Sequence, residues 1–195
     1  MKLLVIAHPK ILKNETLLVN QLFDAGLPVF HLRKPTADEA AHRKFMDGIL
    51  PQYHNRVALH HFHTLANDYN IKRLHHTESF RKCSTVGDFS QRYIFSTSIH
   101  QIAEIDHISQ YHYSFFGPVF NSLSKPGYQG ITHPGFNIKQ PKTTKLIALG
   151  GIRPDNIEEV KAMNFDGVAL LGTIWNEPAQ AIINFKKIQA KCQQI

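Results

Sequence analysis

Two glycine turns late in the chain are the first candidates for chemistry. Residues 148–152 read Ala-Leu-Gly-Gly-Ile, and residues 168–173 read Val-Ala-Leu-Leu-Gly-Thr. Each places glycine where a predicted strand gives way to a helix. Glycine lets backbone N–H groups approach an anion closely, and a helix N-terminus favours negative charge. Two ordinary turns would read the same way, but two in succession favour a phosphate site built by Gly150, Gly151, Gly172 and Thr173.

A polar loop follows another predicted strand. Residues 117–125 read Gly-Pro-Val-Phe-Asn-Ser-Leu-Ser-Lys, so the strand leads into two hydroxyls and an ammonium. Ser122, Ser124 and Lys125 can all donate hydrogen bonds to phosphate oxygens. Alone, such a segment is more often a polar loop than a site.

Two further strand ends carry polar pairs. His31 and Arg33 lie two apart, so both can point into the same face of a strand. An arginine there needs an anion, supplied either by a bound diphosphate or by a structural carboxylate. Ser96 and Ser98 also share a face, and His100 is a candidate cap for the next helix.

The 13 histidines include two groups on predicted neighbouring strands. His61 and His75 are expected to face each other across the interior, where imidazoles suit a zinc-type ion or general acid–base chemistry. A set of partly buried histidines without a metal is the alternative. The members of the two groups are His60, His61, His63, His75 and His76.

Composition narrows the class of protein. The 195 residues carry a formal charge of +7, but no run of Lys or Arg exceeds two, which favours a small anionic ligand over nucleic acid. No apolar run approaches the roughly 20 residues that span a bilayer. Cys83 and Cys192 match no metal or redox spacing, and we expect reduced thiols in a cytoplasmic protein. The sequence is compatible with a homodimer but does not determine the oligomeric state.

Short apolar runs alternate with amphipathic stretches along the whole chain. Asn14 and Asp38 are expected to cap helices that run to about residues 25 and 50, and Gly26 to end the first. The last helix is predicted near 178–191 and buries Ile182, Ile183 and Phe185. Further helices are predicted at 101–109 and after Pro154, and the strands at 3–7, 28–33, 56–61, 72–76, 93–98, 113–120, 145–150 and 167–171.

Eight such strands indicate a parallel α/β fold, and we predict one compact (β/α)8 TIM-barrel domain over residues 1–195. A doubly wound sheet would place a glycine-rich turn after the first strand, where this chain reads His-Pro-Lys at 8–10. Residues 122–144 are rich in Pro, Gly, Lys and Thr, so a loop is expected in place of the sixth helix. The loops after strands 7 and 8 of a barrel are the usual phosphate site.

Together these segments resemble one family, thiamine phosphate synthase and its thiazole tautomerase relatives. His-Leu-Arg at 31–33 is similar to the family's Gln-Leu-Arg, and Ser98 with His100 to its Ser-x-His. Residues 117–125 resemble its Gly-Pro-Ile-Phe-x-Thr-x-Thr-Lys. Residues 148–152, followed by Asn156 and the Asp-Gly-Val-Ala at 166–169, resemble its closing signature.

The resemblance implies a reaction. In the family, a pyrimidine diphosphate ionises with the help of Mg²⁺, and the thiazole nitrogen captures the cation. It implies that Arg33, Ser98 and Lys125 hold the diphosphate. Ser122 and Ser124 would contact phosphate or the thiazole, and Gly151 with the Gly172–Thr173 turn would bind the thiazole phosphate.

The resemblance fails where the family binds Mg²⁺. The Asn-Asp pair on strand 3 is His60-His61 here, and Phe80 falls near the position of the second carboxylate, with Glu78 slightly out of register. Imidazole is a poor ligand for Mg²⁺. His61 and Glu78 therefore remain weak metal candidates. In the strand-6 segment the tautomerase relatives use a histidine where this chain has Pro118.

Three functions stay open from the sequence. The first is a thiamine phosphate synthase-like transferase. The second is a tautomerase acting on a thiazole phosphate carboxylate, with His31, His61 or His75 as acid and base. The third is a barrel that binds thiazole phosphate without chemistry.

Overall fold

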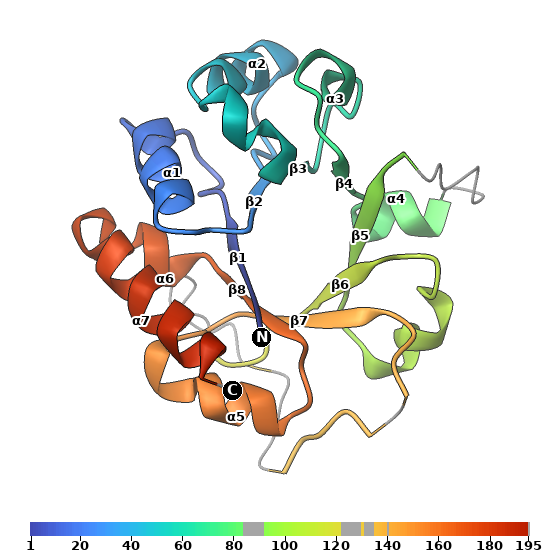
Figure 1. The fold of residues 1–195 in the computed structure, drawn as a ribbon. Helices are drawn as coiled ribbons and strands as arrows, with labels where there is room; N and C mark the ends of the chain where they lie inside the picture. The colour runs from blue at the N-terminus through green and yellow to red at the C-terminus, as the bar shows by residue number, and fades with distance from the viewer. Residues whose placement is uncertain (84–91, 122–129, 131–134, 140, 195) are drawn as a thin grey trace.

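The computed structural model describes residues 1–83, 92–121, 130, 135–139 and 141–194. Its eight parallel strands follow one another in chain order, and the last pairs with the first to close a barrel. The predicted (β/α)8 fold is confirmed, and Figure 1 shows the helices arranged around the outside of the strands. The strands are β1 (Lys2–Ile6), β2 (Val29–Leu32), β3 (Val57–Leu59), β4 (Arg73–His75), β5 (Ile94–Ile99), β6 (Tyr113–Phe116), β7 (Lys145–Leu149) and β8 (Gly167–Leu170).

The helices between the strands are short. Between β6 and β7, the described residues 117–121, 130, 135–139 and 141–144 form no helix, as expected. No helix within the described ranges has the length and apolarity to cross a bilayer. The α-helices are α1 (Glu15–Asp24), α2 (Glu39–Asp47), α3 (Leu65–Asp68), α4 (Glu78–Cys83), α5 (Ile157–Ala162), α6 (Gly172–Trp175) and α7 (Ala181–Gln193). The 3-10 turns are η1 (Pro51–Arg56), η2 (Ile102–His107), η3 (Pro154–Asn156) and η4 (Pro178–Gln180).

The helix ends test the predicted caps. Asp38 caps α2 as expected, because its Oδ1 accepts the N–H of Ala41 at 2.8 Å. Gly26 ends α1 in the left-handed region, at φ 96°. Asn14 is a wrong prediction, since it is itself left-handed and its side chain makes no cap bond. The carboxylate of Glu15 accepts the N–H of Leu12 instead, at 3.2 Å.

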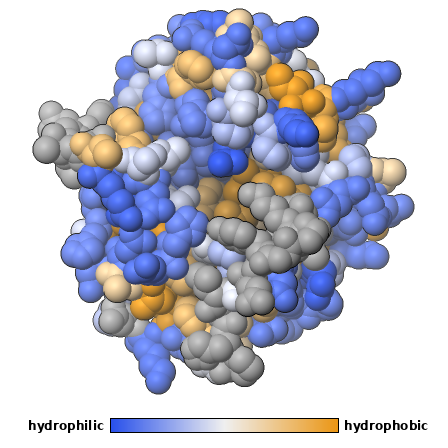
Figure 2. All heavy atoms as spheres, turned by 180° about the vertical axis from the view of Figure 1, so that it is seen from behind, coloured by the Kyte–Doolittle hydropathy of each residue, from blue (hydrophilic) through white to orange (hydrophobic). Residues whose placement is uncertain are grey.

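Apolar side chains form two cores. The larger lies between the strands and the helices, and the smaller fills the barrel interior with Leu4, Ile6, Tyr113, Phe115, Ile147 and Ala169. Strand residues therefore alternate between the two. In α7, Phe185 and Ile188 are buried, whereas the predicted burial of Ile183 is wrong because its side chain is 49% exposed on the outer face. The face seen in Figure 2 is mainly hydrophilic, with more apolar residues near its middle.

A buried ion pair fixes the end of β2. Lys34 is 2% exposed, and its Nζ donates to both carboxylate oxygens of Glu15, at 2.6 and 2.5 Å. The same ammonium donates to the carbonyls of His8 at 2.7 Å and Lys10 at 2.9 Å. Four acceptors thus compensate the cost of burying the charge. The ion pair ties the end of β2 to the start of α1, and the two carbonyls tie it to the loop before α1, so Lys34 is a structural residue.

Candidate functional site

The loops after β6, β7 and β8 lie against one another at the end of the barrel where strands finish. We call residues 117–121, 150–152 and 171–173 the glycine mouth. The N–H of Val119 donates to the carbonyl of Leu149 at 2.8 Å, and that of Phe120 to Gly150 at 3.1 Å. The β6 loop is therefore hydrogen-bonded along the β7 loop like an added strand.

Glycine is needed where these two loops meet. A Cβ on Gly117 would lie 2.1 Å from the carbonyl oxygen of Leu149, and a Cβ on Gly150 would lie 2.8 Å from Cα of Pro118. Gly150 and Gly151 also have φ of 104° and 65°, in the region that side chains rarely adopt. The double glycine thus serves the loop packing as well as any ligand.

Backbone amides are the donors that the glycine mouth offers. Within the ranges that the structure describes, the N–H groups of Gly151, Gly172 and Thr173 make no hydrogen bond. The Thr173 hydroxyl donates to the carbonyl of Ile152, and the Asn156 amide donates to the carbonyl of Gly151 at 2.9 Å. Unpaired amides held this way are suited to bind a phosphate.

Two other side chains hold the glycine mouth in place. His100 Nδ1 donates to the carbonyl of Gly117 at 2.6 Å, so His100 supports the β6 loop. The prediction that it caps the next helix is wrong, because Gln101 is the N-cap of η2. The indole Nε1 of Trp175 donates to the carbonyl of Ile6 at 2.7 Å, which joins α6 to β1 where the barrel closes. The glycine mouth therefore rests on both neighbouring strands, β5 and β1.

A second polar group fills the opposite side of the barrel interior. We call His31, His60 and His75, from β2, the end of β3 and β4, the histidine cluster. All three are buried, with exposures of 0%, 6% and 2%. Nδ1 of His31 lies 2.9 Å from Nε2 of His60, and the rings of His60 and His75 stack with centroids 3.9 Å apart.

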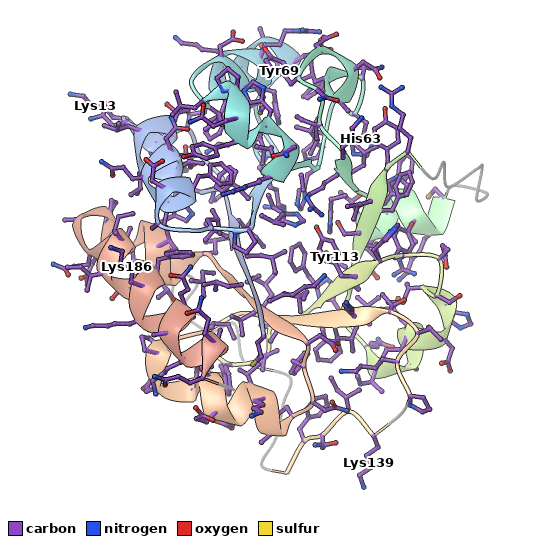
Figure 3. The ribbon with its side chains drawn as sticks, viewed as in Figure 1. Lys13, His63, Tyr69, Tyr113, Lys139 and Lys186 are labelled. Carbon is purple, nitrogen blue, oxygen red and sulfur yellow. The ribbon has the colours of Figure 1, made fainter. Side chains whose placement is uncertain are left out.

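Hydroxyl groups hold the other nitrogens of the cluster. Tyr113 Oη lies 2.8 Å from Nε2 of His31, and Figure 3 shows Tyr113 inside the barrel. His75 Nδ1 lies 2.9 Å from Ser96 Oγ, and its Nε2 lies 3.2 Å from Ser98 Oγ. The rings of His31 and His75 are thereby fixed in orientation by neighbours on β5 and β6, and the ring of His60 is held by His31 and His75.

Burial keeps the cluster uncharged. It lowers the pKa of His31 to about 3, with a smaller contribution from the charge of Arg73. Burial, together with repulsion between neighbouring histidines, also lowers the pKa of His60 and of His75 well below the ordinary value. Burial raises the pKa of Tyr113 to about 12. At neutral pH the network therefore consists of neutral imidazoles and hydroxyls.

The structure corrects which strand-3 histidine faces His75. His60 takes that place, because Ala58 points into the barrel and His60 follows two residues later. His61 instead lies near His42, with ring centroids 6.2 Å apart. Both strand-3 histidines still border a cavity of about 330 Å³, which is lined by His60, His61, Phe62, His63, His75, Thr77 and Phe80.

The remaining predicted site residues are placed as follows. Arg33 is exposed at the end of β2, close enough for its charge to lower the pKa of His60 and His75. His31 is fully buried beneath this level and is not among the residues that line the 330 Å³ cavity, and its two ring nitrogens contact His60 and Tyr113. Glu78 pairs with Lys82 at 2.5 Å on α4. Ser122, Ser124 and Lys125 lie outside the described residues.

The sequence did not identify Tyr113 as a partner of the histidine cluster. A tyrosine at the start of an apolar strand is interpreted as an ordinary core residue. The available signal was strand parity: Phe116 packs outward in the larger core, whereas Tyr113 and Phe115 belong to the interior set.

The fold is a closed (β/α)8 barrel, a class of fold in which the loops after strands 7 and 8 are the usual place for a phosphate. The family model for thiamine monophosphate synthase matches residues 3–174. The chain therefore belongs to the thiamine monophosphate synthase family. No curated protein matches the chain.

Solved structures agree with this assignment. A thiamine phosphate pyrophosphorylase from Bacteroides thetaiotaomicron is 25% identical, with a TM-score of 0.78 over 99% of this chain and 98% of that one. One from Pyrococcus furiosus is 17% identical, with a TM-score of 0.78 over 99% and 96%. A 3-hexulose-6-phosphate synthase from Salmonella typhimurium is 12% identical, with a TM-score of 0.65 over 100% and 99%. The last two show likeness of fold alone.

Proposed function

We propose that this chain is a transferase that joins a pyrimidine diphosphate to a thiazole phosphate. The observation that carries the proposal is the glycine mouth, where the N–H groups of Gly151, Gly172 and Thr173, on two adjacent loops, have no hydrogen-bond partner among the described residues. These donors suit the phosphate monoester of the thiazole. The family match over residues 3–174 supports the same substrates.

The proposed reaction needs a place for the diphosphate and stabilisation of its departure. The bond from the pyrimidine methylene carbon to the diphosphate oxygen breaks, and diphosphate leaves with the electron pair. The thiazole nitrogen then uses its lone pair to form the new C–N bond. Among the residues that the structure describes, Arg33 is the cation that suits the departing diphosphate, because it is exposed at the end of β2. Lys125, outside the described residues, is the second candidate.

Mg²⁺, which the family implies, does not fit this chain. The positions expected to bind it carry the imidazoles of His60 and His61, and a hard cation prefers oxygen ligands. The candidate carboxylate, Glu78, is paired with Lys82, and its other oxygen lies 3.5 Å from His100 Nε2. The chain's own cations must therefore provide the charge stabilisation in the proposed reaction.

Product formation tests the proposal. Purified protein is incubated with the pyrimidine diphosphate and the thiazole phosphate, without metal and with Mg²⁺, Mn²⁺ or Zn²⁺, beside a family member known to be active. Thiamine phosphate is the expected product, and Arg33→Ala should slow its formation. Tight binding of thiazole phosphate by calorimetry, with no product under any condition, would replace the transferase by a binding barrel.

A second function is favoured by one observation. Neutral His60 and His75 border the 330 Å³ cavity, where a neutral imidazole can exchange protons with a bound molecule. This arrangement suits a tautomerase that moves a proton on a thiazole phosphate carboxylate. Single variants of His60, His61 and His75, the three that line this cavity together with His63, test it. Isomerisation that is unchanged in all three would exclude this function.

A further inference from the structure

The histidine cluster has the composition and spacing of a metal site. One nitrogen from each of His31, His60 and His75 lies within 4.8 Å of one nitrogen from each of the others. The three side chains come from neighbouring strands, so the β-barrel itself holds them together. We propose that His31, His60 and His75 together bind one divalent transition-metal ion of the zinc class.

The distances suit such an ion after a small rearrangement. Imidazole nitrogens bind Zn²⁺ at roughly 2.0–2.1 Å, which places two ligands of a tetrahedral ion roughly 3.3 Å apart. Nδ1 of His31 and Nε2 of His60 are 2.9 Å apart. The rings of His60 and His75 lie nearly parallel, at 20°. An ion must lie in the plane of each ligating ring, so binding turns one of the two out of the stack.

The groups around the cluster resemble the supports of a metal centre. A ligating histidine usually holds its other ring nitrogen against an oxygen, which fixes the tautomer and the ring orientation. Tyr113 Oη takes this place on Nε2 of His31, and Ser96 Oγ takes it on Nδ1 of His75. Nδ1 of His31 and Nε2 of His75 are then the nitrogens that would face the ion. The hydroxyl of Ser98, which lies 3.2 Å from Nε2 of His75, must turn away from that nitrogen when the ion binds.

The donor set selects the kind of metal. Three neutral imidazoles suit zinc, cobalt, nickel or copper, whereas Mg²⁺ and Ca²⁺ require oxygen ligands. Three protein ligands leave a fourth position open on a tetrahedral ion. His60 and His75 both line the 330 Å³ cavity, so a water molecule or a phosphate oxygen can fill that position.

This inference does not rest on the proposed function, because metal binding is measured without substrates. The full chain is stripped with chelator and given one equivalent of Zn²⁺ or Co²⁺. We expect one ion per chain, a raised Tm, and the visible absorption of Co²⁺ bound by nitrogen ligands. A large excess of Mg²⁺ should leave the bound Co²⁺ in place. Wild-type protein that binds no ion, or that releases Co²⁺ to Mg²⁺, would overturn the proposal.

Variants assign the binding to the cluster. His75→Gln should weaken Co²⁺ binding at least tenfold, and His107→Gln, at an exposed position on η2, should leave it unchanged. Tyr113→Phe keeps the ring that fills the barrel but removes the hydroxyl from His31, and should weaken binding roughly 10- to 100-fold. This nearly isosteric variant serves even if His75→Gln fails to fold. Unchanged binding in Tyr113→Phe, with the absorption spectrum unaltered, would contradict the assignment.

Discussion

The two sides of the barrel's functional end are built from different materials. The glycine mouth, at β6 to β8, presents backbone amides, and its loops pack closely enough to require glycine. The histidine cluster, at β2 to β4, consists of side chains supported by other side chains. A backbone site keeps its chemistry while neighbouring side chains change, whereas single substitutions can replace the chemistry of a side-chain site. This difference would allow the chain to keep the proposed phosphate site although His60 and His61 stand where the family resemblance implies an Mg²⁺-binding Asn-Asp pair.

The largest effect is expected from the ion pair that supports the side-chain half. Lys34→Met leaves Glu15 buried and unpaired, and should lower the free energy of unfolding by about 3–5 kcal/mol in urea titrations. Arg43→Met, which breaks pairs that are 43% exposed or more, should cost far less, because exposed ion pairs add little net stability. Adding Glu15→Leu to Lys34→Met should restore much of the loss. A Lys34→Met variant as stable as wild type would show that this half does not depend on the pair.

The next largest effect is expected in the glycine mouth, where backbone geometry and not side-chain chemistry is tested. Gly150→Ala places a methyl group 2.8 Å from Cα of Pro118 at φ 104°, and should lower the free energy of unfolding by about 2–3 kcal/mol while weakening phosphate binding. Gly135 also has a positive φ, of 81°, but a Cβ added there would have no atom within 4 Å. Gly135→Ala is therefore the control. That control should cost about 1 kcal/mol and leave phosphate binding intact. Equal losses in both variants would mean that loop packing contributes nothing.

Acid should weaken the histidine half selectively. The folded-state pKa of His31, about 3, lies below its ordinary value of 6.5, so the unfolded chain binds the proton more readily. Stability is therefore full above pH 6.5 and falls as pH drops toward 3, by about 2 kcal/mol at pH 5 for His31 alone. Unfolding in chelator at pH 7.5 and 5.0 measures this. His31→Gln should flatten the pH dependence, and the exposed variant His107→Gln should preserve it.

The smallest effect on stability is expected at Arg33. Because this side chain is exposed and at the end of β2, Arg33→Ala should change the free energy of unfolding by less than about 0.5 kcal/mol. Its charge should matter for anions, so affinity for inorganic diphosphate should fall about tenfold by calorimetry. Lys186→Ala is the matched control, because Lys186 lies on the outer helix α7, where Figure 3 labels it. Equal diphosphate affinity in Arg33→Ala would place that anion elsewhere.

The sequence predicted where all eight strands lie, because their apolar runs are local signals. It extended the sixth strand to residue 120, whereas β6 ends at Phe116 and residues 117–121 form a loop. It also located the glycine mouth, since the double glycine follows β7 directly. The exchange of His60 for His61 has a physical cause. Val57 and Leu59 pack outward against the helices, which turns Ala58 and His60 inward. Following the alternation of inward and outward residues along strand 3 would have assigned His60 to the histidine cluster. Alignment to the family's Mg²⁺-binding motif pointed to His61 instead.

The contacts between distant segments were beyond sequence reasoning. No residue near Lys34 in the sequence identifies its partner, and only the folded chain places Glu15 beside it. The sequence predicts His100 as a helix cap, yet its ring donates to the carbonyl of Gly117 in the loop after the neighbouring strand β6. In both cases the partner is set by how strands and loops meet in three dimensions, which no short window of sequence contains.

The indole of Trp175 gives the molecule an optical reporter of its own. It is the single tryptophan in the chain, it is 5% exposed, and it follows two residues after Thr173. Its Nε1 donates to Ile6 across the seam between β8 and β1. Fluorescence from this one ring should therefore register both the opening of the seam during unfolding and the arrival of an anion at α6, with no label attached.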